Sequence, residues 1–358
     1  MTLSFQYTQQ LSDFELDASG SLPEGEICGL FGANASGKTT LLRRLAGIAD
    51  TKEKGSLQLN EQIIEDSTEC LPAWKRPLTY LSQRPQLLPH LSVRKNIEFA
   101  QARAQSEAVV ELEELYQRFK IKHLLDSSVN KLSGGEQQRV VLVRALVSSR
   151  PWLLMDEPFS AIAESSRFEL LSELKRYVRQ SKQSVLMVSH DRRELAQICD
   201  YLMIIESGKI VAEGPFMTLA TELDQSFAEQ SHALSIMEGI LTEEQDGDLR
   251  CVDVSGQSIW TRVEGGRVNE SCRIHIPANE ISISLEPLQN TSMLNHLKGE
   301  IIEIGDPQSG HRLVKIHAVE HNLLINLTER SINNLNLSVG LNCYCHFKAV
   351  AGYALDDE

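Results

Sequence analysis

An apolar segment that runs directly into a glycine-rich loop and a lysine-threonine pair constrains the fold more than any other feature of this sequence. The segment 27–31 reads ICGLF, and a helix-like stretch over 39–46, closed by Gly47, follows the loop. The loop fits the pattern G-x-x-x-x-G-K-T with the residues Gly32, Ala33, Asn34, Ala35, Ser36, Gly37, Lys38 and Thr39. A buried strand, a loop and a helix in this order present backbone N–H groups to an anion, so the pattern predicts a phosphate-binding loop.

The chemistry of such a loop assigns roles to its side chains. Backbone N–H groups wrap the phosphates, Lys38 reaches the β and γ oxygens, and Thr39 ligates Mg²⁺. Thr40, the next residue of the helix, joins the candidate nucleotide-binding residues. A plain glycine-rich turn with a surface lysine is the alternative, and the flanking strand and helix argue against it.

A second apolar run ends abruptly in two carboxylates. Residues 152–155 read WLLM, and Asp156 and Glu157 follow. The carboxyl end of a buried parallel strand faces the ligand in open α/β sheets. We therefore expect Asp156 to hold Mg²⁺, through water, and Glu157 to act as general base for an attacking water. Two acidic residues after a strand can also cap a helix, which is the structural alternative.

Apolar segments alternate between strand-like and helix-like patterns from residue 1 to about 214, which is typical of a parallel sheet covered by helices. The predicted strands are short and rich in branched residues: 27–31, 78–81, 152–155, 184–188 and 201–205. Helices are predicted between them, at 39–46 and around 109–119. Together with the phosphate loop, this pattern predicts an α/β P-loop NTPase fold.

The pattern changes in the second part of the chain. A further helix is predicted over roughly 216–238, and short alternating strands follow at 258–263, 273–276, 299–304, 313–319, 322–327 and 342–349. Strands of this length and spacing suggest a small all-β barrel of the OB type. The change of period places a domain boundary near residues 235–242, so we expect domains over 1–235 and 236–358.

Composition excludes several classes of protein. With 358 residues and 42% hydrophobic residues the chain is long enough for two or three domains. A net charge of −14 argues against nucleic acid as a partner and against direct docking on anionic lipid. No segment reaches the roughly 18 to 20 uninterrupted apolar residues of a spanning helix, and the N-terminus does not resemble a signal peptide. Seven scattered cysteines fit reduced thiols. Cys343, Cys345 and His346 could hold a metal, but core packing is favoured because no second ligand pair follows.

The segment 132–140, LSGGEQQRV, is the most informative one after the phosphate loop. Ser133 and Glu136 stand at capping-box spacing, so a well-capped helix is the local interpretation. Gly134 and Gly135 indicate an anion site as well, because a helix N-terminus without side chains leaves its N–H groups open to an external anion. The segment resembles the signature motif of ABC-transporter ATPases.

This resemblance implies further roles, because the other motifs of that family occur here in the same order. Gln83, in YLSQRPQLLPHLSVRKNI, matches the position that contacts Mg²⁺ and signals to the membrane subunit. His190, in VLMVSHD, matches the position that contacts the γ-phosphate. The resemblance implies a head-to-tail homodimer in which ATP lies between the phosphate loop of one copy and Ser133 with Gly135 of the other.

The chain departs from the family pattern at two positions. Ala35 replaces a glycine that is usual in the phosphate loop and restricts the backbone modestly. Ala163, in PFSAIA, replaces the aspartate that usually ends this segment, which puts communication between the two nucleotide sites in doubt.

Phe14 and Tyr7 are both candidates for the aromatic residue that stacks on adenine.

The C-terminal part resembles the small molybdate-binding (Mop-like) domain of molybdate importer ATPases, over about 289–356. The resemblance rests on TSMLNHLKG at 291–299, on FKAV at 347–350 and on the preceding IHIPANEISISLEP. It implies a tetrahedral oxyanion, molybdate or tungstate, held by Ser292, Lys348 and backbone N–H groups. Residues 241–358 carry 17 acidic and 9 basic side chains, so local donors must hold this anion against a repulsive field.

The sequence therefore predicts an ATPase that powers import of molybdate or tungstate through separate membrane permease subunits, served indirectly by a substrate-binding protein. Such a subunit would lie on the cytoplasmic face of the inner membrane. The main alternative is an importer for sulfate, iron, sugar or polyamine with a barrel that only regulates. An ABC ATPase without a membrane partner and a protein that only stores or senses oxyanion are two further hypotheses.

Overall fold

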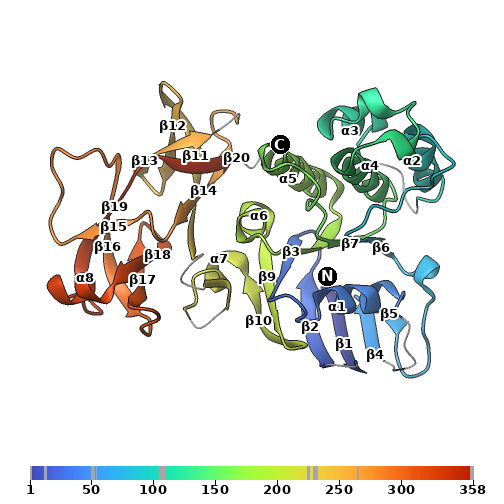
Figure 1. Cartoon of the computed structure of the whole chain (residues 1–358), viewed down its shortest axis with the longest axis horizontal. Coiled ribbons are helices and arrows are strands. Elements are labelled where there is room, and N and C mark those ends of the chain that lie inside the picture. Colours follow the sequence, from blue (N-terminus) through green and yellow to red (C-terminus); the bar gives the residue numbers. More distant parts are fainter. Residues whose placement is uncertain are drawn as a thin grey trace. The chain divides into compact units, whose positions relative to one another are not determined.

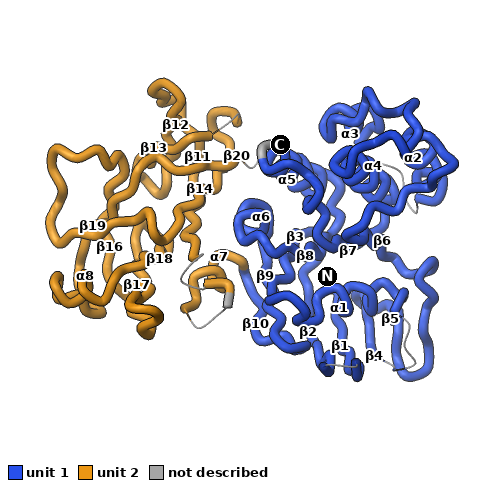
Figure 2. The backbone as a smooth tube through the Cα atoms, in the orientation of Figure 1, with its two compact units in different colours: residues 1–215 blue, residues 216–358 orange. Residues whose placement is uncertain are grey.

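The computed structural model describes residues 2–11, 14–49, 53, 55–104, 110–223, 226–228, 233–263 and 266–354. The chain divides into two compact units, residues 1–215 and 216–358, which Figure 2 shows in different colours. We describe each unit by itself. Within the described residues, none of the helices combines the length and the apolar character needed to cross a lipid bilayer.

A six-stranded sheet in the order β10-β9-β3-β8-β7-β6 is the centre of the first unit (Figure 1). Its strands are β3 (Ile27–Phe31), β6 (Leu78–Leu81), β7 (Trp152–Asp156), β8 (Ser184–Val188), β9 (Tyr201–Glu206) and β10 (Lys209–Pro215). Neighbours from β9 to β6 pair in parallel, and β10 is an antiparallel edge strand. Every residue of β3, β7 and β8 is buried, as expected for parallel strands covered on both faces. All five predicted strands are confirmed.

A second, antiparallel sheet of the first unit is not among the predicted elements. Its order is β2-β1-β4-β5, with β1 (Thr2–Gln10), β2 (Glu15–Pro23), β4 (Gly55–Leu59) and β5 (Gln62–Glu65). Buried residues alternate along β1, which is the pattern of a strand with one face on the core. A single apolar cluster joins side chains of β1, β2 and β4 to α1 and to the buried strands of the central sheet.

The helices of the first unit are α1 (Lys38–Ala46), α2 (Val93–Gln101), α3 (Leu112–Arg118), α4 (Gly134–Leu146), α5 (Glu164–Ser181) and α6 (Arg192–Ile198). Helix α1 confirms the predicted helix at 39–46, and Gly47 ends it in a left-handed conformation with a φ of 72°. Helix α3 lies inside the predicted helix at 109–119, whose first residue is outside the described residues. Short 3₁₀ turns cover Ala73–Lys75, Lys122–Leu124 and Val129–Lys131.

The second unit contains a closed barrel and a separate five-stranded sheet. The barrel has the order β11-β12-β13-β20-β14, with β11 (Leu234–Asp246), β12 (Leu249–Val254), β13 (Gln257–Val263), β14 (Ser271–Pro277) and β20 (Val350–Ala354). The sheet has the order β15-β19-β16-β17-β18, with β15 (Ser282–Ser284), β16 (Asn295–Ile304), β17 (His311–Ala318), β18 (His321–Thr328), β19 (Asn342–Phe347) and the nearby helix α8 (Glu329–Asn334). One apolar cluster contains buried side chains from both.

One prediction for this part needs correction. The helix predicted over 216–238 is wrong, because the described residues there form only α7 (Phe216–Leu219), a 3₁₀ turn at Ser226–Ala228 and the start of β11. Residues 234–237 pair with β14 and are all buried, so the helix-like apolar pattern comes from a strand covered on both sides. The predicted all-β barrel is confirmed as a closed five-stranded barrel, and a separate five-stranded sheet accompanies it, to which all four strands predicted beyond residue 295 belong. The compact units divide at 215/216, whereas the predicted boundary near 235–242 falls within β11.

Candidate functional site

Apart from residues 133–135, the predicted nucleotide residues of the first unit lie at the carboxyl ends of adjacent parallel strands. The phosphate loop follows β3, Gln83 follows β6, Asp156 ends β7, Glu157 comes directly after it, and His190 follows β8. Because these ends meet at one edge of the sheet, side chains far apart in the sequence come together. A cavity of ≈ 200 Å³ lies there, lined by Phe14, Asn34, Ala35, Gly37, Lys38, Thr39, Thr40, Asp156, Glu157 and Val188.

The phosphate loop requires backbone conformations and close approaches that favour small residues. Gly37 has a φ of 107°, and a Cβ on Gly32 would lie 2.2 Å from the carbonyl oxygen of Ile205. Ala35 has a φ of 62°, in the left-handed region where glycine has no steric penalty. Ala35 is therefore a strained residue of the loop, because its left-handed conformation costs about 1–2 kcal/mol.

Lys38 is held in place by its own loop. Its Nζ donates hydrogen bonds of 2.7 Å to the carbonyl oxygens of Gly32 and Ala33. An ammonium group has three N–H donors, so this arrangement leaves one for a ligand oxygen. Burial lowers the pKa of Lys38, whereas the carboxylates of Glu157 and Asp156 act in the opposite direction.

Two hydroxyl groups donate hydrogen bonds to the carboxylate of Asp156 at the end of β7. Thr39 Oγ1 donates to Asp156 Oδ1 at 3.2 Å, and the hydroxyl of Tyr80 donates to Asp156 Oδ2 at 3.3 Å. Burial raises the pKa of Asp156 in spite of these two hydrogen bonds. Tyr80 is a site residue that sequence reasoning missed. Its position on β6, three residues before Gln83, was the available signal.

Glu157 lies between two of the predicted residues. Gln83 Nε2 donates to Glu157 Oε2 at 2.9 Å, and His190 Nδ1 lies 3.3 Å from Glu157 Oε1. Glu157 has a φ of 49°, and its N–H donates to the carbonyl oxygen of Val188 at 3.1 Å, which fixes this unusual backbone conformation. Two other segments of chain, around Gln83 and over 188–190, thus hold Glu157 in place.

The signature segment forms a capped helix, but its residues are not part of the cavity within one chain. The side chain of Ser133 accepts from the N–H of Glu136 at 3.4 Å, and the carboxylate of Glu136 accepts from the N–H of Ser133 at 2.8 Å. This is the capping box that the spacing predicts. Hydrogen bonds from Ser133 lower the pKa of Glu136. Ser133 and Gly134 remain exposed, so the helix N-terminus is open to a partner.

The segment around Ala163 lies against the signature helix and is linked through Arg167 to Glu194 of α6. A Cβ added to Gly135 would lie 3.2 Å from the carbonyl oxygen of Ala161. Ala163 precedes α5 and provides no side-chain cap for it. Arg167 donates to the carbonyl oxygen of Ile162 at 3.0 Å and to Glu194 at 2.8 Å.

Glu194 continues this chain of contacts toward His190. It accepts from Ser189 Oγ at 2.7 Å, next to His190, and burial raises its pKa. The pair Arg167–Glu194 therefore links the Ala163 segment to the residue before His190. Sequence reasoning missed both residues because neither lies in a recognised motif.

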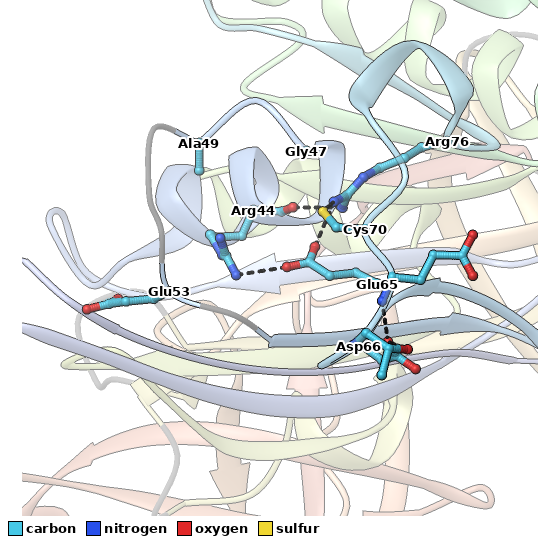
Figure 3. A pocket seen from close by; sticks show the side chains of 10 residues that line it. Arg44, Gly47, Ala49, Glu53, Glu65, Asp66, Cys70 and Arg76 are labelled. Carbon is cyan, nitrogen blue, oxygen red and sulfur yellow. Dashed lines mark hydrogen bonds and ion pairs between the residues drawn. The ribbon is translucent and has the colours of Figure 1, made fainter.

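A second cavity of the first unit, of ≈ 270 Å³, is lined by other residues (Figure 3). Arg44 and Arg76 point from two sides toward Glu65, with N–O distances of 3.1 and 2.6 Å. The hydroxyl of Tyr7 also donates to Glu65, at 3.1 Å, and Tyr7 is fully buried. Because these charges pair with one another, we assign no nucleotide here. Tyr7 cannot stack on adenine, whereas Phe14 lines the phosphate-loop cavity.

The two predicted oxyanion residues lie in the second unit, at the same end of two paired strands. Asn295 of β16 pairs with Phe347 of β19, so Ser292 precedes this end of the sheet and Lys348 follows it. Both side chains are exposed. Asn295 ties the two segments together, because its Nδ2 donates to the carbonyl oxygen of Lys348 at 3.2 Å. Cys343 and Cys345 are buried in the core between the sheet and the barrel.

Comparisons with known proteins agree with this geometry. The family model described as ABC transporter matches residues 16–160. The molybdenum import ATP-binding protein ModC of Methylococcus capsulatus is 36% identical over 340 residues, which cover 94% of this chain and 95% of that protein. The protein of the same name from Thiobacillus denitrificans is 34% identical, with 94% of each chain covered.

Solved structures show the fold of the first unit. The structure of an ATP-binding subunit of an ABC transporter aligns with a TM-score of 0.52 and 23% identity, covering 61% of this chain and 92% of that one. A dimeric ATP-binding cassette bound to ADP and phosphate aligns with a TM-score of 0.50 and 21% identity, covering 60% and 98%. On the strength of the near-full-length relatives, the chain belongs to the ABC transporter ATPases and, among them, to the family of molybdenum import ATP-binding proteins.

Proposed function

We propose that this chain hydrolyses ATP to power the import of molybdate or tungstate through separate membrane permease subunits. The observation that carries the proposal is that the likeness to molybdenum import proteins runs through both units and not only through the ATPase motifs. In this assignment residues 1–235 bind and hydrolyse ATP, and residues 236–358 bind the oxyanion. The chain would attach to the cytoplasmic face of the membrane through its permease, and a substrate-binding protein would deliver the cargo.

The first unit offers the donors that a Mg²⁺-nucleotide needs. The loop N–H groups and Lys38 bind the phosphates, and Phe14 offers an aromatic face at the cavity. The hydroxyl of Thr39, the carboxylate of Asp156 and the amide of Gln83 supply the oxygen ligands that Mg²⁺ prefers. The bound ion would neutralise charge on the phosphates.

Within this arrangement Glu157 takes a proton from the attacking water. Gln83 and His190 hold its two carboxylate oxygens, so the base is oriented before the nucleotide arrives. His190 is then placed to contact the γ-phosphate. Tyr80 and Thr39 orient the carboxylate of Asp156.

A second copy of the chain completes the site. Ser133 and Gly134 are exposed at the N-terminus of α4, and they do not line the phosphate-loop cavity of their own chain. Open N–H groups at a helix N-terminus favour a phosphate. We infer that each ATP binds between the loop of one copy and the Ser133 segment of the other.

In the second unit Ser292 and Lys348 hold a tetrahedral oxyanion together with backbone N–H groups. A dianion in an acidic environment needs short, charge-assisted hydrogen bonds. Sulfate has the same charge and shape with shorter bonds, so donors placed for molybdate lie too far from its oxygens. The proposal therefore includes selectivity for molybdate and tungstate over sulfate.

A thermal-shift panel on the full chain tests the cargo assignment. A ligand that binds only the folded state raises the unfolding midpoint. We expect molybdate and tungstate to raise it, sulfate and phosphate to have little effect, and Ser292→Ala or Lys348→Ala to remove the shift. His311→Gln, an exposed histidine of the same unit, is the matched control. A sulfate preference, or no response to any oxyanion by a dimeric sample, would refute the molybdate assignment and leave the ATPase assignment intact.

Transport itself requires the permease. The chain should co-purify with membrane subunits, and ATP-dependent uptake of molybdate into vesicles that contain the complex should depend on Glu157. Uptake of sugar or polyamine instead would select the alternative cargo.

A further inference from the structure

A histidine in the second unit contacts both ends of the segment that carries Ser292. The segment 285–294 connects β15 to β16, so it begins after Ser284 and ends just before Asn295 and His296. His346 of β19 lies between these two strands and pairs in register with Ser282 on one side and with His296 on the other. Its Nε2 lies 2.7 Å from Ser284 Oγ, and its Nδ1 lies 2.7 Å from His296 Nδ1.

The donors and acceptors of this cluster can be assigned from its geometry. Ser284 Oγ donates its single proton to the carbonyl oxygen of Glu286 at 2.5 Å, because a carbonyl can only accept. Ser284 Oγ must therefore accept from His346, so Nε2 of His346 carries a hydrogen. In a neutral His346 the other nitrogen, Nδ1, is then an acceptor, and His296 donates to it. The three hydrogen bonds therefore all point the same way: His296 donates to His346, His346 donates to Ser284, and Ser284 donates to the carbonyl oxygen of Glu286.

This assignment requires a neutral His346. With the hydrogen of His296 on its Nδ1, a proton on Nδ1 of His346 would set two N–H donors against each other over 2.7 Å. His346 is 1% exposed, and burial, followed by the nearby His296, lowers its pKa. Tyr344, whose ring is parallel to that of His346 at 6.4 Å, lies on this face of the sheet together with Lys298 and Glu300 of β16, and Glu286 belongs to the segment itself. Among the described residues, neither carboxylate forms an ion pair with His346.

We propose that His346 is a positioning residue that holds both ends of segment 285–294 through its contacts with Ser284 and His296, an arrangement that we call the clasp. The clasp fixes Ser292 for oxyanion binding, and it releases the segment when His346 is protonated. The proposal rests on the proposed oxyanion site for its function. The clasp itself can be tested without any oxyanion, so the two can fail separately.

The direction of the pH dependence follows from the lowered pKa of His346. Once the segment is released, His346 of β19 titrates near the ordinary histidine value of about 6.5, whereas the clasped His346 stays neutral to lower pH. The released form therefore takes up protons first as the pH falls. The clasp is fully stabilised above about pH 6.5 and loses stability as the pH falls below it.

Hydrogen exchange of the full chain, without oxyanion, tests the clasp. Ser284→Ala and His296→Ala each remove one tie at a partly or fully exposed position, and His346→Phe removes both. A neutral hydrogen bond contributes about 1 kcal/mol, which corresponds to about fivefold in an equilibrium constant. We expect exchange in segment 285–294 to accelerate about fivefold in each single variant and more in His346→Phe, with no change in the control His311→Gln.

His346→Gln separates position from charge. Glutamine carries a donor and an acceptor but does not titrate between pH 5 and 8, so it should retain protection of the segment at pH 8 and lose the pH dependence. Exchange is compared between variants at the same pH, which removes the intrinsic effect of pH on exchange. Equal exchange in the parent, Ser284→Ala and His296→Ala would overturn the clasp, and so would a pH response of His346→Gln equal to that of the parent.

Calorimetric titration with molybdate links the clasp to function. We expect the parent to bind several-fold more weakly at pH 5.5 than at pH 8, and His346→Gln to show a smaller difference. If the parent binds no oxyanion while exchange responds as predicted, the proposed oxyanion site fails and the clasp stands. If molybdate binds the parent, Ser284→Ala and His296→Ala equally, the clasp does not position Ser292 and this inference is refuted.

Discussion

Replacing Glu157 by glutamine removes the proton acceptor of the site and little else. The amide keeps the length of the side chain, and its oxygen can still accept from Gln83 Nε2, which lies 2.9 Å from the carboxylate in the parent. The amide nitrogen can turn toward His190. The backbone conformation is set by the hydrogen bond from the N–H of Glu157 to Val188, which the substitution does not touch.

The size of the effect follows from the role. A positioned general base contributes about 10²- to 10⁴-fold to a rate, and each tenfold step corresponds to about 1.36 kcal/mol of barrier. Turnover of Glu157→Gln should therefore fall by two to four orders of magnitude, or about 2.7 to 5.4 kcal/mol. ATP affinity should stay the same or increase, because a negative charge beside the γ-phosphate is removed.

Phosphate release at saturating ATP measures turnover, and calorimetry with ATP measures binding. Lys38→Ala should fail earlier, at nucleotide binding, because it removes the cation that reaches the phosphates. Glu164→Gln, an exposed carboxylate of the same segment, is the matched control and should hydrolyse at the parent rate. If Glu157→Gln also hydrolyses ATP at the parent rate, Glu157 is not the base and the site has been misread.

Three further predictions concern the surroundings of the site. Gly135→Asp, combined with Glu157→Gln, should abolish the ATP-dependent dimer in light scattering without unfolding the monomer, because a carboxylate would stand beside the partner's phosphates; a persistent dimer contradicts the shared site. Glu65→Gln should lower the free energy of unfolding in urea by about 3–5 kcal/mol, since it leaves two buried arginines without their carboxylate; a loss below about 1 kcal/mol would mean that water already screens them. Ala163→Asp should supply the missing cap of α5 and raise that free energy by about 1 kcal/mol, and a decrease would show that the segment cannot accommodate a carboxylate.

Much of the first unit is predictable because its signals are local. The phosphate loop is one continuous segment, and each buried parallel strand is an uninterrupted apolar run such as WLLM before Asp156. Parallel strands place their carboxyl ends at one edge, so the proximity of Asp156, Glu157, Gln83 and His190 follows from their positions after predicted strands.

The missed features depend on partners that are distant in the sequence. Strand β11 looks helical because residues 234–237 are buried on both sides and do not alternate between polar and apolar faces, and only its pairing with β14 decides otherwise. Tyr80 and Glu194 become site residues through hydrogen bonds to Asp156 and Ser189, which no local pattern encodes. The tie between Ser284, His296 and His346 requires the register of three strands, so motif resemblance alone could not reveal it.

Strand β20 gives the second unit an order of assembly. The barrel is built from residues 234–277 and from residues 350–354, which insert between β13 and β14. During synthesis four strands are complete while the gap in their hydrogen-bonded ring is still open, and the whole five-stranded sheet emerges before the gap can close. The barrel therefore cannot close until the sheet has been synthesised, and we expect the barrel and the sheet to become protected from hydrogen exchange in a single step. Removing only β20 should therefore expose two strand edges and the apolar interior at once, and should turn a folded unit into one that aggregates.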